Sequence, residues 1–241
     1  MITAGVNRGA EQLALPFAIG WGGARANAGR RRKPGRGNVA HRERGAHRRR
    51  EPVLVTLRYR LWSLRHRFVF PTVHAVIAAA NRRGEGRFRI AHFSVQENHV
   101  HLVVEAESRG DLLSGMRGFS VSLTRQVNRL LMRRGPLLAD RWHARALKTP
   151  RMVRYALLYV LANGRKHGVT TGLVDPLSSA PYFAGFRQFV GRAPCLGEPQ
   201  LLPSSVRARP PPVVAPATWL LCSGWRRGGL LSIHDAPKAP R

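Results

Sequence analysis

Residues 112–130 constrain the fold more than any other segment, because their apolar side chains recur at steps of three and four. This spacing predicts a helix that buries one face, and Gly135 marks its end. The face consists of Leu112, Met116, Phe119, Leu123, Val127 and Leu130. A helix with one apolar face needs a partner layer, so we expect a layered domain.

Shorter patterns supply that layer. Alternating apolar residues predict strands over 53–59, 88–95, 100–105 and 142–148. Helical spacing predicts a further helix over 73–84 and a last one over 150–166, which Thr149 and Pro150 begin as N-cap and first residue. The order is strand, helix, strand, strand, helix, strand, helix. Its first six elements predict an α+β fold with a ferredoxin-like or RRM-like antiparallel sheet and helices on one face.

The charge of the chain indicates a polyanionic partner. There are 41 Lys and Arg against 12 Asp and Glu, for a net charge of +29. A GC-rich genome also raises the arginine content, and we expect both causes to contribute. Nucleic acid is the leading partner, since each cation that meets a phosphate releases a counterion. A membrane is not expected, because no apolar run reaches spanning length and no basic amphipathic helix has a broad aromatic face.

The helix over 112–130 carries part of this charge on its polar side. Its arginines are Arg117, Arg125, Arg129 and Arg133, and the last three are spaced by four. Such a stripe is usually a solvated face, but phosphate contact is an equal alternative in so basic a chain. The four arginines are therefore candidate DNA-binding residues.

Composition divides the chain into three parts. Residues 1–51 form a basic arm rich in Gly, Arg and His, expected to be disordered alone; it either orders on DNA or is a mere leader segment. Residues 52–190 hold the folded domain. Residues 191–241 are a Pro-rich linker and a short basic segment that either docks on the core or touches DNA. Cys195 and Cys222 form no zinc spacing or disulfide framework, and we expect a cytoplasmic protein.

Two histidines in the third strand form a candidate metal site. His99 and His101 are two residues apart, so their imidazoles lie on one face of the strand, while Val100 and Leu102 point into the core. Two such rings can chelate one metal ion. The alternative is a half-exposed strand face that happens to carry two polar residues.

The last helix carries a candidate nucleophile. Tyr155, Tyr159 and Asn163 are each four residues apart and share one face. A tyrosine in an apolar helix is usually part of the core. A phenolic nucleophile, whose unperturbed pKa is about 10, needs a metal ion or nearby cations. Arg154, Arg165 and Lys166 are available, and Asn163 adds an amide ligand, but the strand and helix faces must meet.

These motifs together resemble a known family. The run from Glu97 through Asn98, His99, Val100 and His101 to Glu105 looks like the histidine–hydrophobic–histidine strand of the single-tyrosine HUH transposases. The REP-associated tyrosine transposases are the branch that it resembles most. Tyr159 with Asn163, and the stretch of Arg141, Trp142 and His143, resemble that branch's tyrosine and aromatic-histidine motifs. The resemblance covers roughly residues 52–185, slightly more than half the chain.

The resemblance implies a DNA transposase activity. His99 and His101 would hold Mg²⁺ or Mn²⁺ with Asn163 as third ligand, and Tyr159 would attack a DNA phosphate, forming a 5′-phosphotyrosine link and a free 3′-OH. The substrate would be hairpin DNA with single-stranded flanks, bound by a monomer or homodimer. Further DNA contacts are expected from His143, Arg165 and Lys166.

Two departures and several alternatives stay open. Relatives often have Pro where this chain has Gly164 and, in many cases, where it has Glu97, although neither change removes a chemical group. Tyr155 is a rival nucleophile, but only Tyr159 has an asparagine four residues later. A domesticated protein could bind repeat hairpins without transposition. A replication initiator or relaxase, and an RNA-binding protein with an incidental histidine pair, fit the sequence less well.

Overall fold

The computed structural model of the chain describes residues 46–166, 174–189 and 204–235. Its centre is a four-stranded antiparallel sheet in the order β2-β3-β1-β4. With one helix after β1 and one after β3, this is the ferredoxin-like order, so the predicted α+β fold class is confirmed. The strands are β1 (Val53–Arg58), β2 (Phe88–Val95), β3 (His99–Ala106) and β4 (His143–Ala146).

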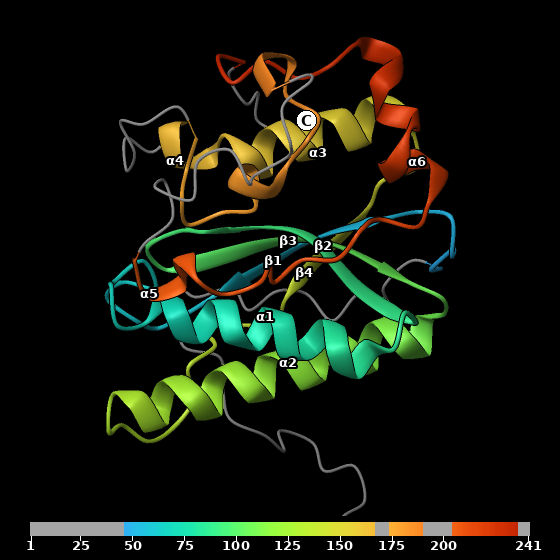
Figure 1. Cartoon of the computed structure of the whole chain (residues 1–241). Helices are drawn as coiled ribbons and strands as arrows, with labels where there is room; N and C mark the ends of the chain where they lie inside the picture. The colour runs from blue at the N-terminus through green and yellow to red at the C-terminus, as the bar shows by residue number, and fades with distance from the viewer. Residues whose placement is uncertain (1–45, 167–173, 190–203, 236–241) are drawn as a thin grey trace, which may run out of the picture. The chain divides into compact units, whose positions relative to one another are not determined.

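Two helices cover one face of the sheet, α1 (Phe70–Gly84) and α2 (Arg109–Leu130), as Figure 1 shows. The apolar stripe of α2 faces the sheet, with Phe119 fully buried among strand residues of the larger core. Gly115 allows close packing against β2, because a β-carbon there would collide with the ring of Phe88. Helix α2, which has the strongest periodic pattern in the sequence, therefore forms the outer layer over the larger core.

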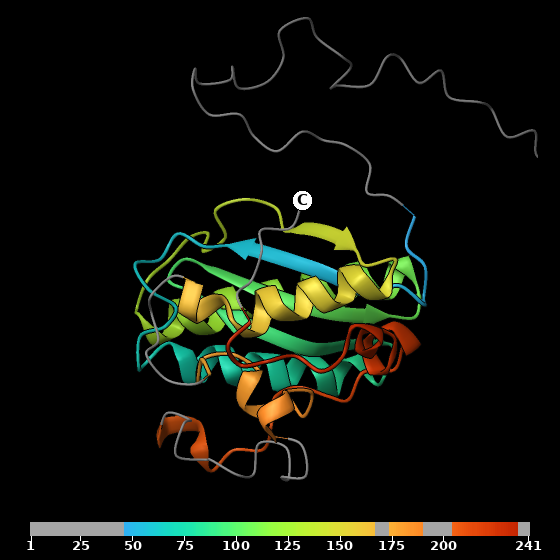
Figure 2. The same cartoon turned by 90° about the horizontal axis from the view of Figure 1, so that it is seen from above.

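The opposite face carries α3 (Pro150–Leu161) and the short α4 (Asn163–Lys166). Thr149 caps α3 as predicted, its hydroxyl accepting a hydrogen bond from the backbone N–H of Met152. The single helix expected over 150–166 is interrupted at Ala162, before an Asn and a Gly that both have low helix propensity. Helix α3 packs on β2 and β3, and on this face it leaves β4 and the end of β1 at Arg58 uncovered, whereas Leu54 of β1 is buried with α3 (Figure 2).

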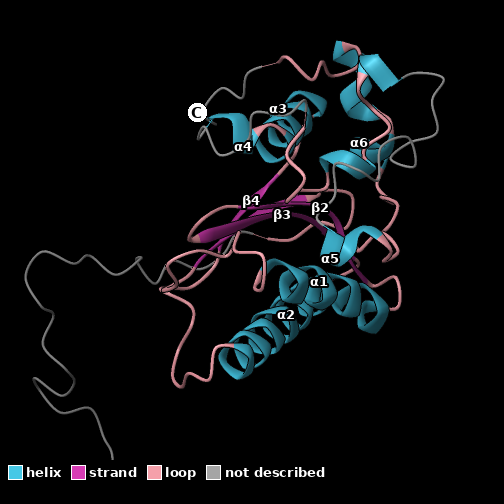
Figure 3. Ribbon diagram, turned by 60° about the vertical axis from the view of Figure 1, so that its left-hand side comes forward, coloured by secondary structure: helices cyan, strands magenta, loops and turns pink. Residues whose placement is uncertain are grey.

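The described part of the C-terminal segment docks on the core, one of the two roles that the sequence left open. Leu221, Trp225 and Leu231 are buried in a second core, which they share with the apolar side of α3 (Figure 3). The described elements that follow α4 are η1 (Ala180–Tyr182), η2 (Arg187–Phe189), α5 (Ser204–Arg207), α6 (Trp219–Cys222) and η4 (Gly224–Gly228).

A buried carboxylate of β3 attaches this segment. Glu105 is 3% exposed and accepts three hydrogen bonds, from the N–H of Ala217 and from the N–H and hydroxyl of Thr218. Charge-assisted bonds of this kind are worth more than neutral ones, so the start of α6 is fixed to the sheet.

Several predictions fall on residues outside the described ones. These are most of the N-terminal arm (1–45), the first part of the Pro-rich linker (191–203) with Cys195, and the side chains of Arg165 and Lys166. Within the described ranges, no helix has the length and apolarity needed to cross a bilayer.

Candidate active site

The register of the sheet places the polar residues of four strands in one row. His101 of β3 lies between Thr56 of β1 and Ser94 of β2, and Thr56 in turn is opposite His143 of β4. Directly paired residues of antiparallel strands point to the same face. The row therefore lies on the α3 face, and Val100 and its alternating neighbours fill the core beneath α1 and α2, as predicted.

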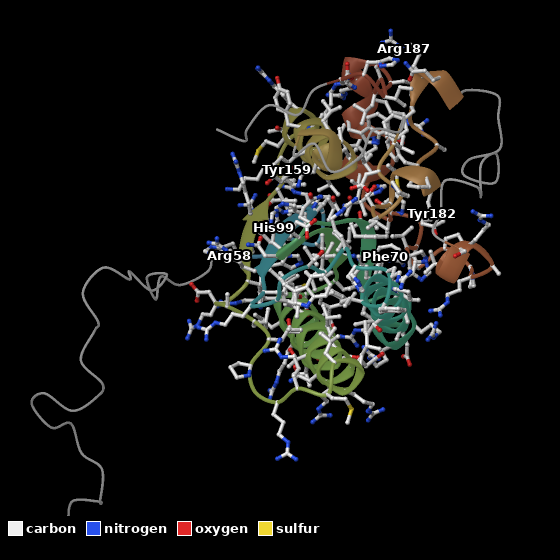
Figure 4. The ribbon with its side chains drawn as sticks, turned by 90° about the vertical axis from the view of Figure 1, so that its left-hand side faces the viewer. Arg58, Phe70, His99, Tyr159, Tyr182 and Arg187 are labelled. Atoms are coloured by element: carbon white, nitrogen blue, oxygen red, sulfur yellow. The ribbon has the colours of Figure 1, made fainter. Side chains whose placement is uncertain are left out.

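Helix α3 brings Tyr159 onto this row. Its phenol oxygen lies 3.1 Å from Nε2 of His101, and the two rings are 4.7 Å apart between centroids. The rings of His99 and His101 are also 4.7 Å apart. Figure 4 shows Tyr159 above His99 on one flank of the molecule, with Arg58 below. The strand face and the helix face therefore meet, which the sequence could not establish.

Hydrogen bonds orient both imidazoles. Nδ1 of His99 is 3.0 Å from the side-chain oxygen of Asn98, and Nδ1 of His101 is 2.9 Å from the hydroxyl of Thr56. An amide oxygen only accepts, so His99 carries its proton on Nδ1. The Thr56 hydroxyl can accept from Nδ1 of His101, and in that arrangement the lone pair of His101 is on Nε2. Partners of this kind fix the tautomer and ring direction that a metal-binding histidine requires.

Asn163, one turn beyond Tyr159, has an unsatisfied side chain. It is fully buried, and neither its amide oxygen nor its amide nitrogen has a hydrogen-bond partner among the described residues. A buried polar group without a partner costs about 1–3 kcal/mol, so such groups are rare unless a ligand completes them. An orphaned amide four residues after Tyr159 and two oriented imidazoles are groups of the kinds that can hold a divalent cation.

The possible donor set is limited. Within the described ranges, no cluster of three or more His, Cys, Asp and Glu side chains is close enough to hold a metal ion. A cation at this site would therefore depend on His99, His101 and the Asn163 amide, with water or substrate phosphate as further ligands. Three protein ligands leave coordination positions open, so this donor set suits an ion that also binds a phosphate oxygen.

A buried ion pair supports the turn that carries Asn163. Asp175 is 1% exposed and forms two hydrogen bonds with the guanidinium of Arg65, each 2.8 Å long. Arg65 also donates to the carbonyl of Val95 at the end of β2. A β-carbon on Gly164 would collide with the Asp175 carboxylate, which explains why glycine follows Asn163 here. Nothing in the local sequence indicated the pairing of Arg65 with Asp175.

The two tyrosines of α3 lie in different surroundings. Burial raises the pKa of Tyr159, so its phenol is neutral near pH 7 in the absence of a cation. Tyr155 is exposed, and its hydroxyl accepts a hydrogen bond from Nε of Arg151 at 3.3 Å. The geometry thus pairs Tyr159, rather than Tyr155, with the histidines.

The basic stripe of α2 is not part of this arrangement. Arg117, Arg125 and Arg129 are exposed and Arg133 is half-buried, but α2 lies on the layer opposite α3. The structure thus separates Arg117, Arg125 and Arg129 from Tyr159, whereas Arg133 follows the helix and donates to the carbonyl of Arg60.

On the α3 face of the sheet, basic residues other than the α2 arginines lie near the histidines. His143 is exposed there, and the register adds Arg58 opposite His99 and Arg145 opposite Leu54. The alternation along the first and fourth strands was the signal that would have identified both arginines.

Comparisons with known proteins give little further information. No model of a known protein family matches the sequence, and neither does any curated protein. Among solved structures, a REP-associated tyrosine transposase bound to a REP hairpin matches with a TM-score of 0.46 and 17% identity, over 64% of this chain and 87% of the other. A likeness of this degree does not assign the chain to a family.

Proposed function

We propose that the chain cleaves and rejoins single-stranded DNA, with Tyr159 as the nucleophile and a divalent metal ion held by His99, His101 and Asn163. The observation that supports this most is the 3.1 Å separation between the Tyr159 phenol oxygen and Nε2 of His101. Phosphoryl transfer to a phenol requires a nucleophile beside a cation site. A tyrosine on a helix that faces paired imidazoles on a strand meets that requirement.

The chemistry follows from the residues of this face. A bound Mg²⁺ or Mn²⁺ would supply positive charge to the non-bridging phosphate oxygens and would favour the phenolate. The Tyr159 oxygen forms a bond to phosphorus as the bond from phosphorus to the 3′ oxygen breaks. One proton leaves the phenol and one reaches the departing 3′ oxygen. The products are a 5′-phosphotyrosine link and a free 3′-OH.

Rejoining is the reverse reaction with a second DNA end. A different 3′-OH attacks the phosphotyrosine, a new phosphodiester forms, and Tyr159 regains its proton. The number of phosphoester bonds is unchanged, so the exchange needs no nucleotide cofactor. Thr56 and Asn98 hold the two imidazoles in place through both steps.

The uncovered part of the sheet supplies a path for the single-stranded DNA. Arg58, His143 and Arg145 are exposed on the face that carries the histidines, at the end of β1 and along β4, which α3 does not cover. Their spacing across two β-strands suits the sugar–phosphate backbone of single-stranded DNA that enters toward Tyr159. A duplex would keep its bases paired and its scissile phosphate less accessible.

A denaturing-gel assay tests the proposal. Purified protein is mixed with labelled single-stranded DNA from the flanks of its own gene, with Mn²⁺ or with EDTA, beside the Tyr159→Phe and Tyr155→Phe variants. We expect a covalent adduct that needs the metal and disappears only in Tyr159→Phe. Loss only in Tyr155→Phe would move the nucleophile one turn back. Absence of any adduct, with native-gel binding intact, would identify a domesticated protein that binds repeat or hairpin DNA without transposition.

A further inference from the structure

The last residues of the basic arm fold against the far end of β3. The ring of His47 lies within hydrogen-bonding distance of the carbonyl of Ala106, with Nε2 and oxygen 2.8 Å apart. Arg49 forms an ion pair with Glu107, and the N–H of Glu51 closes a turn onto the carbonyl of Arg48. The arginines of this turn are therefore held in place on the core.

These arginines line a pocket of about 530 Å³. Arg48, Arg49 and Arg50 border it from the turn, Arg89 from β2, and Thr218 from the start of α6. Arg89 donates from Nε to the carbonyl of Gly86, which orients its guanidinium. Three separate parts of the chain thus converge on one concave basic surface.

The acidic groups of the pocket are already engaged. Glu105 accepts the three hydrogen bonds from Ala217 and Thr218, and Glu107 is paired with Arg49. The lining holds four arginines against these two glutamates, so the pocket keeps a net positive charge although Arg48 and Arg49 are paired with Glu51 and Glu107. Guanidinium groups gathered in this way match phosphate oxygens, which they bind through paired hydrogen bonds.

An exposed aromatic residue adjoins the pocket. Trp219 follows Thr218, is 53% exposed, and has the guanidinium of Arg227 4.9 Å from its ring centre. A tryptophan left this exposed beside arginines can pack on the sugars of a nucleic-acid backbone, a contact that an isolated ion does not offer. The neighbouring side chains thus favour nucleic acid over a small anion.

The pocket and Tyr159 lie toward opposite ends of the sheet. Tyr159 contacts His101, and Ala106, which His47 contacts, lies five residues further along β3, so at roughly 3.3 Å per residue the two positions are about 17 Å apart. A nucleic-acid duplex rises about 3.4 Å per base pair, so this distance corresponds to about five base pairs. A stiff stem can span it while its unpaired flank reaches the catalytic face.

We propose that this arginine pocket binds the sugar–phosphate backbone of a duplex stem about five base pairs from the phosphate that Tyr159 attacks. The inference rests on the proposed function, since it assigns a second contact to the same DNA. A duplex carries one phosphate charge per about 1.7 Å, a density that suits closely placed arginines better than a single strand does. The pocket contacts backbone and reads shape rather than sequence.

Two paired variants test the assignment. Arg50→Ala/Arg89→Ala removes two charges from the pocket, and Arg125→Ala/Arg129→Ala removes two from the opposite layer. The probes are a hairpin with a stem of about ten base pairs and a single-stranded flank, and the flank alone. We expect the pocket variant to lose about tenfold in hairpin affinity, to lower the salt slope by about two, and to bind the flank alone as the wild type does.

The controls separate the possible failures. Arg50→Ala alone, at an exposed side chain, should give about half of the change in salt slope even if the double variant melts early. Unchanged hairpin affinity in the pocket variants, or an equal loss of affinity for the flank alone, would overturn the assignment. Absence of a Tyr159-dependent adduct from the wild type would instead count against the proposed function.

Discussion

Replacing Asn163 should stabilise the metal-free protein and remove its response to metal. The side chain is fully buried and two of its polar atoms have no hydrogen-bond partner among the described residues. Leucine has nearly the same volume and needs no partner. Since an unsatisfied buried group costs about 1–3 kcal/mol, we expect Asn163→Leu to be more stable in EDTA by about that amount. This corresponds to a rise in melting temperature of about 2–10 °C for a chain of this size.

Added metal should make the melting temperature of the wild type higher than that of Asn163→Leu. A ligand that binds only the folded state raises its stability according to its concentration and affinity. Mn²⁺ should therefore raise the melting temperature of the wild type and leave that of Asn163→Leu unchanged. Stability that rises when a polar side chain is removed is the usual sign of a group kept for function.

A second buried asparagine is the matched control. Asn81 is also buried, but its amide group bonds the carbonyls of Ile90 and Pro212 and the N–H of Ile90. Asn81→Leu should therefore destabilise the protein with or without metal. If Asn163→Leu were equally destabilised in EDTA, or if Mn²⁺ still raised its melting temperature, the amide of Asn163 would have another role and the reasoning would fail.

Three further predictions concern the surroundings of the site. Gly164→Ala should lower the melting temperature by a few degrees and weaken the metal response, because its β-carbon overlaps the Asp175 carboxylate; unchanged stability and response would contradict the packing. Mn²⁺ should support adduct formation at lower concentration than Mg²⁺, since imidazole ligands favour the transition metal, and a titration with each ion checks this. Burial holds the pKa of His74 and His92 at about 4, against about 6.5 when unfolded, so each takes up a proton more readily in the unfolded chain. Stability should therefore fall as the pH drops from 6.5 to 4, by up to about 3 kcal/mol for each histidine, and His92→Phe should reduce the slope in urea unfolding.

The order of the elements could be predicted from the sequence, because each carries its own periodicity. The alternation of His99 and His101 with Val100 and Leu102 also predicted which residues share a face. It held because a strand that covers a core leaves only one face for polar side chains.

The meeting of Tyr159 with His101 could not be predicted. It depends on how α3 packs, and that follows from Leu157 and Val160 on α3 fitting against the sheet and the C-terminal segment. The segment around Trp225 has no periodic pattern, so its docking was open. Arg65 and Asp175 are separated by 110 residues, and no local pattern relates them.

The position of the arginine stripe was within reach of the sequence. The apolar side of α2 packs against the face that holds Val100, so its basic side points away from the histidines. The periodicities of the helix and the strand, taken together, exclude Arg125 and Arg129 from the site. Their role in DNA binding stays a prediction.

Mass spectrometry of the covalent adduct tests the central claim most directly. Tyr155 and Tyr159 lie in one tryptic peptide, between the cleavage sites after Arg154 and Arg165, so fragmentation must assign the modified residue. We expect a nucleotide joined through its 5′ phosphate to Tyr159, formed only when Mn²⁺ is present. A nucleotide on Tyr155, or a Tyr159 adduct that forms equally well in EDTA, would contradict it.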